Sequence, residues 1–253
     1  MMPSNEIRII GLRTLPEVKP GDDLPGFIIL AAEREGIGLQ NGDVVVVTQK
    51  ILSKAEGRLV NLKDVTPSPF AADFGERAGK DPRLVEMVLR ESRRSVRMDR
   101  VLMIMETHHG FVCANAGIDR SNIPGEDIVS LLPVDPDKSA EGIRQAFEQR
   151  ANVRTAVIIS DSFGRPWREG ITEVAIGVAG MDAMKSYMGV NDTEGHELLT
   201  TAVCFADELA SAAGLVMEKI SRVPVAIVRG YNYEPGTMGA QSLVRPPERD
   251  LFR

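Results

Sequence analysis

The chain has 253 residues, of which 43% are hydrophobic and 26% charged, a composition that is typical of one large or two small globular domains. Its net charge of −6 argues against a broad surface for nucleic acid or anionic membranes. No apolar run approaches the roughly 20 residues that span a bilayer, and the first residues lack the regions of a signal peptide. With Cys113 and Cys204 in apolar contexts, the sequence predicts a cytoplasmic protein with reduced thiols.

The N-terminal half predicts two strands, two helices and a hairpin. The β-branched run at 44–48 is typical of a buried strand, and Asp81-Pro82 is a helix start. The predicted elements are, in chain order, a strand at 7–10, a helix at 24–35, a strand at 44–48, a helix from Pro82 to about 94 with Arg93, Arg94 and Arg97 at its solvated end, and a hairpin of 101–105 with 111–114 around His108-His109-Gly110.

The C-terminal half mixes strands and helices without regular alternation. After an extended connector at 131–137, Asp137 or Ser139 is expected to cap a helix that runs to about 150. Strands are predicted at 156–160, 174–178 and 223–229, a helix at 207–219, and a surface tail at 231–253. This order favours an α+β fold over a doubly wound sheet. The glycine signatures of the two commonest nucleotide-binding folds are absent from the sequence.

Two polar segments, each directly after an apolar run, carry the chemistry that stands out most. Residues 115–122 contain Asp119, and residues 160–165 contain Asp161 and Ser162. Carboxylate and hydroxyl oxygens are the ligands that hard divalent cations and their phosphates require. Asp119 and Asp161 are therefore candidate metal ligands, with Ser162 as a hydroxyl for a second cation. The alternative is that both aspartates cap turns after strands.

Other polar residues each have a functional and a structural interpretation. Asn122 suits a phosphate, a base edge or an Asx-turn, and Lys54 suits phosphate oxygens or plain solvent exposure. The segment Leu15-Pro16-Glu17-Val18 is a backbone cradle or a turn.

Histidine and aromatic residues give weaker signals. His108-His109 is better explained as a hairpin tip than as a metal site, because the pair lies at a strand turn and no third histidine lies near it in the sequence. His196 is a candidate substrate-loop residue. Trp167 and Arg168 either line a pocket for a planar or anionic substrate or pack in a core or dimer contact.

Taken together, these segments resemble the coenzyme F-420 γ-glutamyl ligase family (coenzyme F-420-0:L-glutamate ligase). The matching blocks follow the family's order along nearly the whole chain: 15–18, 20–24, 42–50, 53–58, 115–122, 131–137, 158–165 and 223–230. The resemblance implies a mixed α+β fold unrelated to the Rossmann fold, in one unit or two interleaved lobes spanning 1–253, and an intertwined homodimer.

The resemblance also implies a GTP-dependent ligase of coenzyme F-420 biosynthesis. Such an enzyme adds γ-linked L-glutamate to the phospholactyl carboxylate of the deazaflavin coenzyme F-420-0, and in some cases to F-420-1, through an acyl phosphate. It takes two divalent ions, Mg²⁺ or Mn²⁺, with K⁺ as a further candidate ion.

Residues are assigned by the same resemblance. Positions matching the family's GTP contacts are Leu15, Pro16, Glu17, Val18, Gln49, Lys54 and Asn122. Asp119 and Asp161 match ligands of one divalent ion, and Ser162 matches a ligand of a second. No residue is assigned as the base for the glutamate amine.

Two departures from the family pattern bear on the site and on the activity. Archaeal relatives have a glycine-rich stretch between the late helix and the last strand. Here residues 218–222 are glycine-free, with Glu218 as the candidate substitute ligand. Two-domain relatives continue into a flavin reductase-like domain after a tail like 250–252, so we expect a stand-alone ligase.

Two other functional classes remain open. A metal-dependent nucleotide phosphohydrolase would use the same Asp119, Asp161 and Ser162. A non-catalytic nucleotide-binding or oligomerisation module would not need their chemistry at all.

Overall fold

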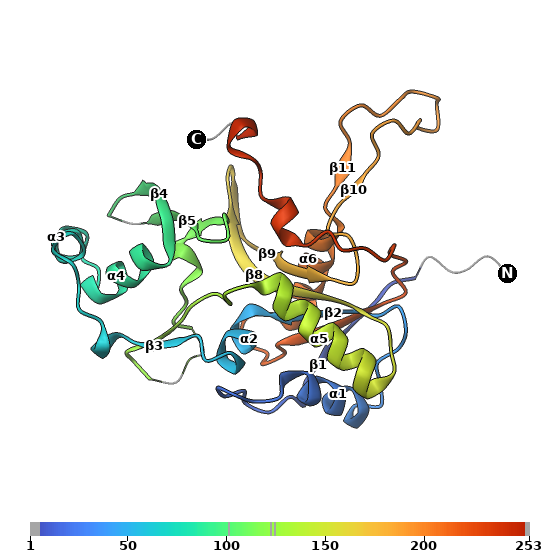
Figure 1. The fold of residues 1–253 in the computed structure, drawn as a ribbon, viewed down its shortest axis with the longest axis horizontal. Coiled ribbons are helices and arrows are strands. Elements are labelled where there is room, and N and C mark those ends of the chain that lie inside the picture. The colour runs from blue at the N-terminus through green and yellow to red at the C-terminus, as the bar shows by residue number, and fades with distance from the viewer. Residues whose placement is uncertain (1–5, 101, 122, 124, 251–253) are drawn as a thin grey trace.

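The computed structural model describes residues 6–100, 102–121, 123 and 125–250. Its centre is a five-stranded sheet in the order β1-β12-β2-β8-β9 (Figure 1). The strands are β1 (Arg8–Leu12), β12 (Val225–Arg229), β2 (Val44–Thr48), β8 (Ala156–Arg165) and β9 (Arg168–Ala179). Only the β2–β8 pair is parallel among these neighbours. The sheet is thus mixed, which confirms the predicted α+β class.

Helices cover both faces of this sheet because its central strands are apolar on both sides. All four valines of β2 are fully buried, as expected for a strand between two covered faces. Helices α1 (Leu24–Arg34) and α5 (Pro136–Ala151) pack over one face, and α6 (Phe205–Met217) packs over the other. Each face has its own hydrophobic cluster. The sheet therefore holds its strands rigidly between two packed layers.

A third hydrophobic cluster gathers around smaller elements beside the main sheet, at the left of Figure 1. They are β3 (Leu59–Asn61), β7 (Ile128–Ser130), α3 (Pro69–Ala78), α4 (Pro82–Arg90), β4 (Ser92–Met98), β5 (Met103–Thr107) and β6 (Val112–Ala114). Strands β3 and β7 pair with each other, and β4, β5 and β6 form a sheet. Short 3₁₀ turns lie at Leu62–Asp64 and Asn115–Gly117. The predicted hairpin of 101–105 with 111–114 is confirmed as β5–β6, apart from residue 101, which lies outside the described residues.

The predicted helix from Pro82 is shorter than expected. It ends at Arg90, and Arg93, Arg94 and Arg97 belong to strand β4 instead of a helix end. Strand β4 pairs with β5, and Arg94 Nε donates to Glu106 Oε2 at 2.7 Å. Pairing with a buried neighbouring strand outweighs the local helical pattern here.

The cap of α5 is also different from the expected one. Asp135, not Asp137 or Ser139, is the N-cap, and its side chain accepts from the backbone N–H of Lys138. Asp137 instead accepts from the backbone N–H groups of Val178 and Ala240. This aspartate ties the first turn of the helix to β9 and to the tail.

The remaining elements lie outside the main layers. Strands β10 (Lys185–Ser186) and β11 (Ala202–Val203) form the base of a long arm that projects from the body, coloured orange in Figure 1. The tail contains the 3₁₀ turns Ala240–Leu243 and Pro247–Arg249. No helix among the described residues has the length and apolar content needed to cross a membrane.

Candidate functional site

The site lies where the parallel strands β2 and β8 leave the covered part of the sheet. Thr48 pairs with Ser160 at this point, and the chain turns from β2 directly into helix α2 (Gln49–Ala55). Parallel neighbours end at the same edge of a sheet, where ligands bind in many α/β proteins. The motifs at 42–50 and 158–165 are adjacent for this reason.

Strand β8 is longer than the sequence predicts. It continues through the polar residues to Arg165, so Asp161 and Ser162 lie inside the strand and not after it. They pair with Val174 and Glu173 of β9, past a register shift at Ile159/Ser160. Such shifts re-aim side chains and are frequent next to functional sites. A rigid two-stranded ribbon therefore carries both residues.

Asp161 and Ser162 point to opposite faces of this ribbon. The hydroxyl groups of Ser160 and Ser162 both donate to Glu173, at 3.1 and 2.6 Å, so these three side chains share one face. Successive side chains of a strand alternate, which puts Asp161 on the other face, on the same side as Ile159 and Phe163. The ribbon thus places Asp161 on one side and Glu173 on the other.

Asp119 is brought to the Asp161 side by a short irregular segment. Its backbone pairs with Ser130 in an isolated bridge. Four and three residues before it, Asn115 and Ala116 have φ angles of 51° and 53° in the left-handed region. Non-glycine residues adopt this conformation at a cost and concentrate at functional sites. The surrounding packing thus fixes the position of Asp119 against local preference.

The two aspartates have opposite electrostatic environments. Burial opposes ionisation of Asp119, but Lys50 Nζ at 2.7 Å and two hydrogen bonds from Ser121 outweigh it and lower its pKa. Burial, joined by the negative charges of Glu173 and Asp119, raises the pKa of Asp161 to about 7. Among the described residues, Asp161 forms no ion pair of its own. Additional positive charge on this side would stabilise both carboxylates.

Helix α2 connects the aspartates to the predicted nucleotide segment. Lys50 and Lys54 are four residues apart and share one face of the helix. Lys50 pairs with Asp119, and Lys54 Nζ donates to Glu17 Oε1 at 2.5 Å. Gln49 is buried and accepts from the Ser53 hydroxyl at 2.9 Å. The helix therefore presents two ammonium groups in a row between the two regions.

Most of the residues predicted to hold GTP lie together around α2. Val18 is buried and Glu17 is largely exposed, and Leu15 packs against the main core with Pro16 beside it on the surface. The segment is anchored where Gly21 N–H donates to Ala55 O at 2.9 Å. Asn122 lies outside the described residues.

Glu173 and Lys219 are site residues that the sequence analysis missed. Glu173 lies one residue before the predicted strand at 174–178, and Lys219 was expected to end a helix. The structure ends α6 at Met217, and Lys219 Nζ donates to Glu173 Oε1 at 2.7 Å and to the Ser162 hydroxyl. The strand period would have placed Glu173 opposite Ser162 only if the pairing register had been known.

The remaining histidine candidates are held by local contacts. His108 and His109 lie at the β5–β6 hairpin tip, as predicted, with their Nε2 atoms on the carbonyls of Arg90 and Pro133. His196 lies on the arm, where its backbone N–H donates to Asp192.

Of the aromatic and thiol candidates, Trp167 is 86% exposed at the β8–β9 turn, so the core-packing interpretation of this residue is wrong. Arg168, the first residue of β9, is also exposed. Both cysteines are free; Cys113 is buried, whereas Cys204 is only partly so.

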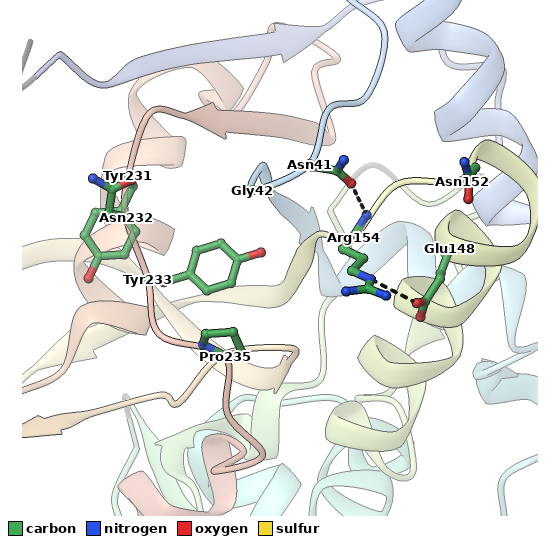
Figure 2. A pocket seen from close by; sticks show the side chains of 9 residues that line it. All are labelled: Asn41, Gly42, Glu148, Asn152, Arg154, Tyr231, Asn232, Tyr233 and Pro235. Atoms are coloured by element: carbon green, nitrogen blue, oxygen red, sulfur yellow. Dashed lines mark hydrogen bonds and ion pairs between the residues drawn. The ribbon is translucent and has the colours of Figure 1, made fainter. Parts of the chain in front are cut away.

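A separate polar pocket of about 650 Å³ lies at the opposite end of β2 and β8 (Figure 2). It is lined by Asn41, Gly42, Glu148, Asn152, Arg154, Tyr231, Asn232, Tyr233 and Pro235. In Figure 2, Asn41 Oδ1 accepts from Arg154 N–H at 2.7 Å, and the Arg154 guanidinium faces Glu148 at 3.6 Å. This pocket contains none of the residues predicted to bind metal or nucleotide.

The donor set at the Asp119–Asp161 side fits a divalent ion of the Mg²⁺ or Mn²⁺ type. No three histidine, cysteine or acidic side chains converge on one point within the described part of the chain, so there is no all-protein metal cage there. Mg²⁺ commonly takes one or two carboxylates and completes its shell with water and substrate phosphates. Burial and, after it, the neighbouring carboxylates raise the pKa of Asp161, and such an ion would stabilise the ionised form of this side chain.

Comparisons of the chain with a family model and with individual known proteins all lead to the same family. A family model described as F420-0:Gamma-glutamyl ligase matches residues 11–230. A protein of Methanothermobacter thermautotrophicus named Coenzyme F420:L-glutamate ligase is 46% identical over 98% of this chain and 99% of its own length. Proteins of the same name from Methanopyrus kandleri and Methanocaldococcus jannaschii are 43% and 41% identical, over 94% and 98% of this chain and 94% and 97% of their own lengths.

Proposed function

Because the chain belongs to the F420-0:gamma-glutamyl ligase family, we propose that it attaches L-glutamate through its amine to coenzyme F-420-0, with GTP as the energy source. The acceptor is the phospholactyl carboxylate of the deazaflavin, and extension of F-420-1 is part of the same proposal. Support for the ligase chemistry comes from the names of relatives that match nearly the full chain.

One structural observation carries the phosphoryl-transfer part of the proposal. The Asp119–Asp161 carboxylates and the Lys50–Lys54 face of α2 form a continuous strip from the sheet edge to segment 15–18. Phosphoryl transfer is catalysed mainly by positioning and charge neutralisation. A strip that has carboxylate oxygens at one end and two ammonium groups beside them can hold a metal ion and a chain of phosphates along its length.

A divalent ion, Mg²⁺ or Mn²⁺, belongs to the proposal, with Asp119 and Asp161 as its protein ligands. When bound, it neutralises charge on the nucleotide phosphates and on the reacting oxygens. Ser162 with Glu173 forms the second candidate position, on the other face of β8. A role for K⁺ remains a prediction from the family resemblance alone.

The residues of this chain would then act by binding and orienting the reactants. Segment 15–18, Gln49 and Asn122 would hold the nucleotide. Lys54 would exchange Glu17 for a phosphate oxygen, because an ammonium is a mobile point charge. The deazaflavin carboxylate oxygen attacks the γ-phosphorus and GDP leaves. The neutral glutamate amine then attacks the acyl carbon, the bond from that carbon to the bridging oxygen breaks so that phosphate leaves with this oxygen, and the nitrogen loses a proton as the amide forms.

An intertwined homodimer is also part of the proposal, and the arm supports it. Met188, Val190 and Leu199 on the arm are each at least half exposed. Apolar side chains that gather on a projecting segment are typical of protein interfaces. A second copy of the chain is the partner that the family resemblance implies.

The direct test is an end-point reaction followed by mass spectrometry, with phosphate release measured in parallel. Purified protein is incubated with F-420-0, L-glutamate, Mn²⁺ and either GTP or ATP. We expect a product heavier by one or more glutamyl units with GTP and not with ATP, and phosphate release that requires glutamate. Phosphate release that is indifferent to glutamate, without a heavier product, would establish a phosphohydrolase instead.

A further inference from the structure

Lys219 occupies the second of the two oxygen clusters that flank β8. Its Nζ donates to Glu173 Oε1 at 2.7 Å and also to the Ser162 hydroxyl, which itself donates to the same carboxylate. Ser160 completes the group through Glu173 Oε2 at 3.1 Å. One ammonium thus contacts the carboxylate and the hydroxyl that are suited to a hard cation on this face.

The loop that carries Lys219 is held in a conformation that its residues do not favour. Glu218 and Arg222, on either side of it, have φ angles of 47° and 57° in the left-handed region. Neither is glycine, so each position costs conformational free energy. The Ser221 hydroxyl donates to Met217 O and closes the loop onto the end of α6. Local preference does not explain this geometry, whereas the contact of Lys219 with a buried carboxylate does.

The exposed fractions of Glu173 and Lys219 suit an ion pair that is stable without ligands and from which the lysine can still be displaced. The Glu173 side chain is 12% exposed, so it needs a positive partner. The Lys219 side chain is 58% exposed and can turn into solvent without leaving a cavity. The corresponding lysine on the other face, Lys50, is only 18% exposed and extends from a helix.

The two faces of β8 therefore differ in what neutralises them. On the first face Asp119 is paired with Lys50, but Asp161 has no ion-pair partner among the described residues; on the second face Glu173 is paired with Lys219. An ammonium and a divalent ion repel each other when they contact the same oxygens, because both are positive. On the first face Lys50 contacts only Oδ2 of Asp119, which leaves Asp119 Oδ1 and Asp161 for an ion, whereas on the second face Lys219 contacts both the carboxylate and the Ser162 hydroxyl. Occupation of the Glu173 side by one excludes the other.

We propose that Lys219 takes the place of the second divalent cation, so that the protein without nucleotide holds one such ion, at Asp119 and Asp161, and an ammonium at Ser162 and Glu173. This inference rests on the divalent-ion part of the proposed function. It assigns a positioning role to Lys219. The glycine-free loop at 218–222 then serves to place the positive charge of this lysine beside Ser162 and Glu173.

The test is the number of Mn²⁺ ions bound by the full chain, measured by isothermal titration calorimetry with Mn²⁺ alone. The wild type and Lys219→Arg, which keeps the charge, are expected to bind one ion. Lys219→Gln and Lys219→Met, which remove it, are expected to bind a second ion at Mn²⁺ concentrations that fill one site in the wild type. Lys138→Gln, an exposed lysine on α5, is the matched control and is expected to behave as the wild type.

Equal stoichiometry in the wild type and in both uncharged variants would overturn the inference, whether that number is none, one or two. Two variants of different shape guard against a local folding defect, and circular dichroism checks each. Because the titration uses no GTP, glutamate or deazaflavin, its outcome is separate from the ligation assay. A working ligase with unchanged Mn²⁺ stoichiometry would remove this inference alone.

Discussion

Asp161 and Lys54 are ionisable residues of one candidate site, and the fold gives them different electrostatic surroundings. Burial and neighbouring carboxylates raise the pKa of Asp161 to about 7, so its charged form lacks compensation within the protein. Lys54 is almost fully buried along its stem but ends on the exposed carboxylate of Glu17. In the proposed function a cation would compensate the charge of Asp161, and Lys54 would exchange Glu17 for a phosphate oxygen.

The exchange at Lys54 leads to a prediction for Lys54→Met. Methionine fills the same space, and Glu17, being exposed, is not left as a buried charge, so the fold is retained. Loss of a hydrogen bond to a charged phosphate, worth about 1.5–3 kcal/mol, should weaken GTP binding by roughly 10- to 100-fold. Equilibrium binding of a fluorescent GTP analogue measures this.

Lys63→Met is the matched control, because Lys63 is a 70% exposed lysine whose partner is Asp127. It should leave binding unchanged. If Lys54→Met binds the analogue as tightly as the control does, Lys54 does not contact the nucleotide.

At the scale of elements, α4 contributes Val85, Met87 and Val88 to the third cluster, and Asp81 caps the start of this helix. Asp81 accepts from the backbone N–H of Arg83 and also pairs with its guanidinium at 2.8 Å. The hydrogen bond from the Arg83 side chain is the main cause of a pKa lowered to about 2 for Asp81. The start of the helix is thus tied down by an ionised carboxylate.

Asp81→Ala should therefore destabilise the protein in a pH-dependent way. The cap contributes about 1 kcal/mol at neutral pH. Because the native pKa is depressed, the charged contribution is complete above about pH 4 and fades as pH falls toward about 2. Asp81→Asn keeps a capping oxygen without charge and should lose less.

Urea unfolding of the three proteins between pH 7 and pH 2.5 measures these differences. A destabilisation by Asp81→Ala that stays constant across this range would contradict the account of the charge.

The elements also show what could be predicted from sequence. Residues 44–48 were predicted with the correct bounds, because a run of β-branched residues has one stable environment, a buried strand. Strand β8 was cut short at 160 because its continuation is polar, and its length depends on pairing with β9. Likewise, β4 carries arginines that resemble a helix end until β5 pairs with it.

The same contrast between local sequence patterns and long-range strand pairing applies to the candidate site. Asp119 and Asp161 were found through the polar residues that follow apolar runs, and the structure brings them close enough for their charges to interact. Glu173 and Lys219 could not be found, because their place depends on a strand register and on a strained loop. Local patterns therefore gave the candidates, and long-range pairing selected which of them face one another.

At the scale of the whole molecule, the arm of residues 185–203 projects away from the packed layers (Figure 1). If it serves a homodimer, exposing Met188 and Leu199 to water in an isolated chain is unfavourable. We expect the wild type to sediment as a dimer and the double variant Met188→Ser, Leu199→Ser to shift toward monomer. Val134→Ser, which changes an equally exposed side chain elsewhere, should remain dimeric.

Analytical ultracentrifugation at several protein concentrations would decide the matter. A wild type that remains monomeric throughout, or a double variant that remains as dimeric as the control, would contradict this use of the arm.

The measurement that tests the central claim most directly is the glutamyl mass shift of F-420-0 in the presence of GTP, compared between the wild type and Asp161→Asn. The account predicts a heavier deazaflavin with the wild type and none with a folded Asp161→Asn, because the variant lacks one of the two carboxylates proposed to hold the divalent ion. A wild type that leaves the mass of F-420-0 unchanged while it hydrolyses GTP without regard to glutamate would contradict it.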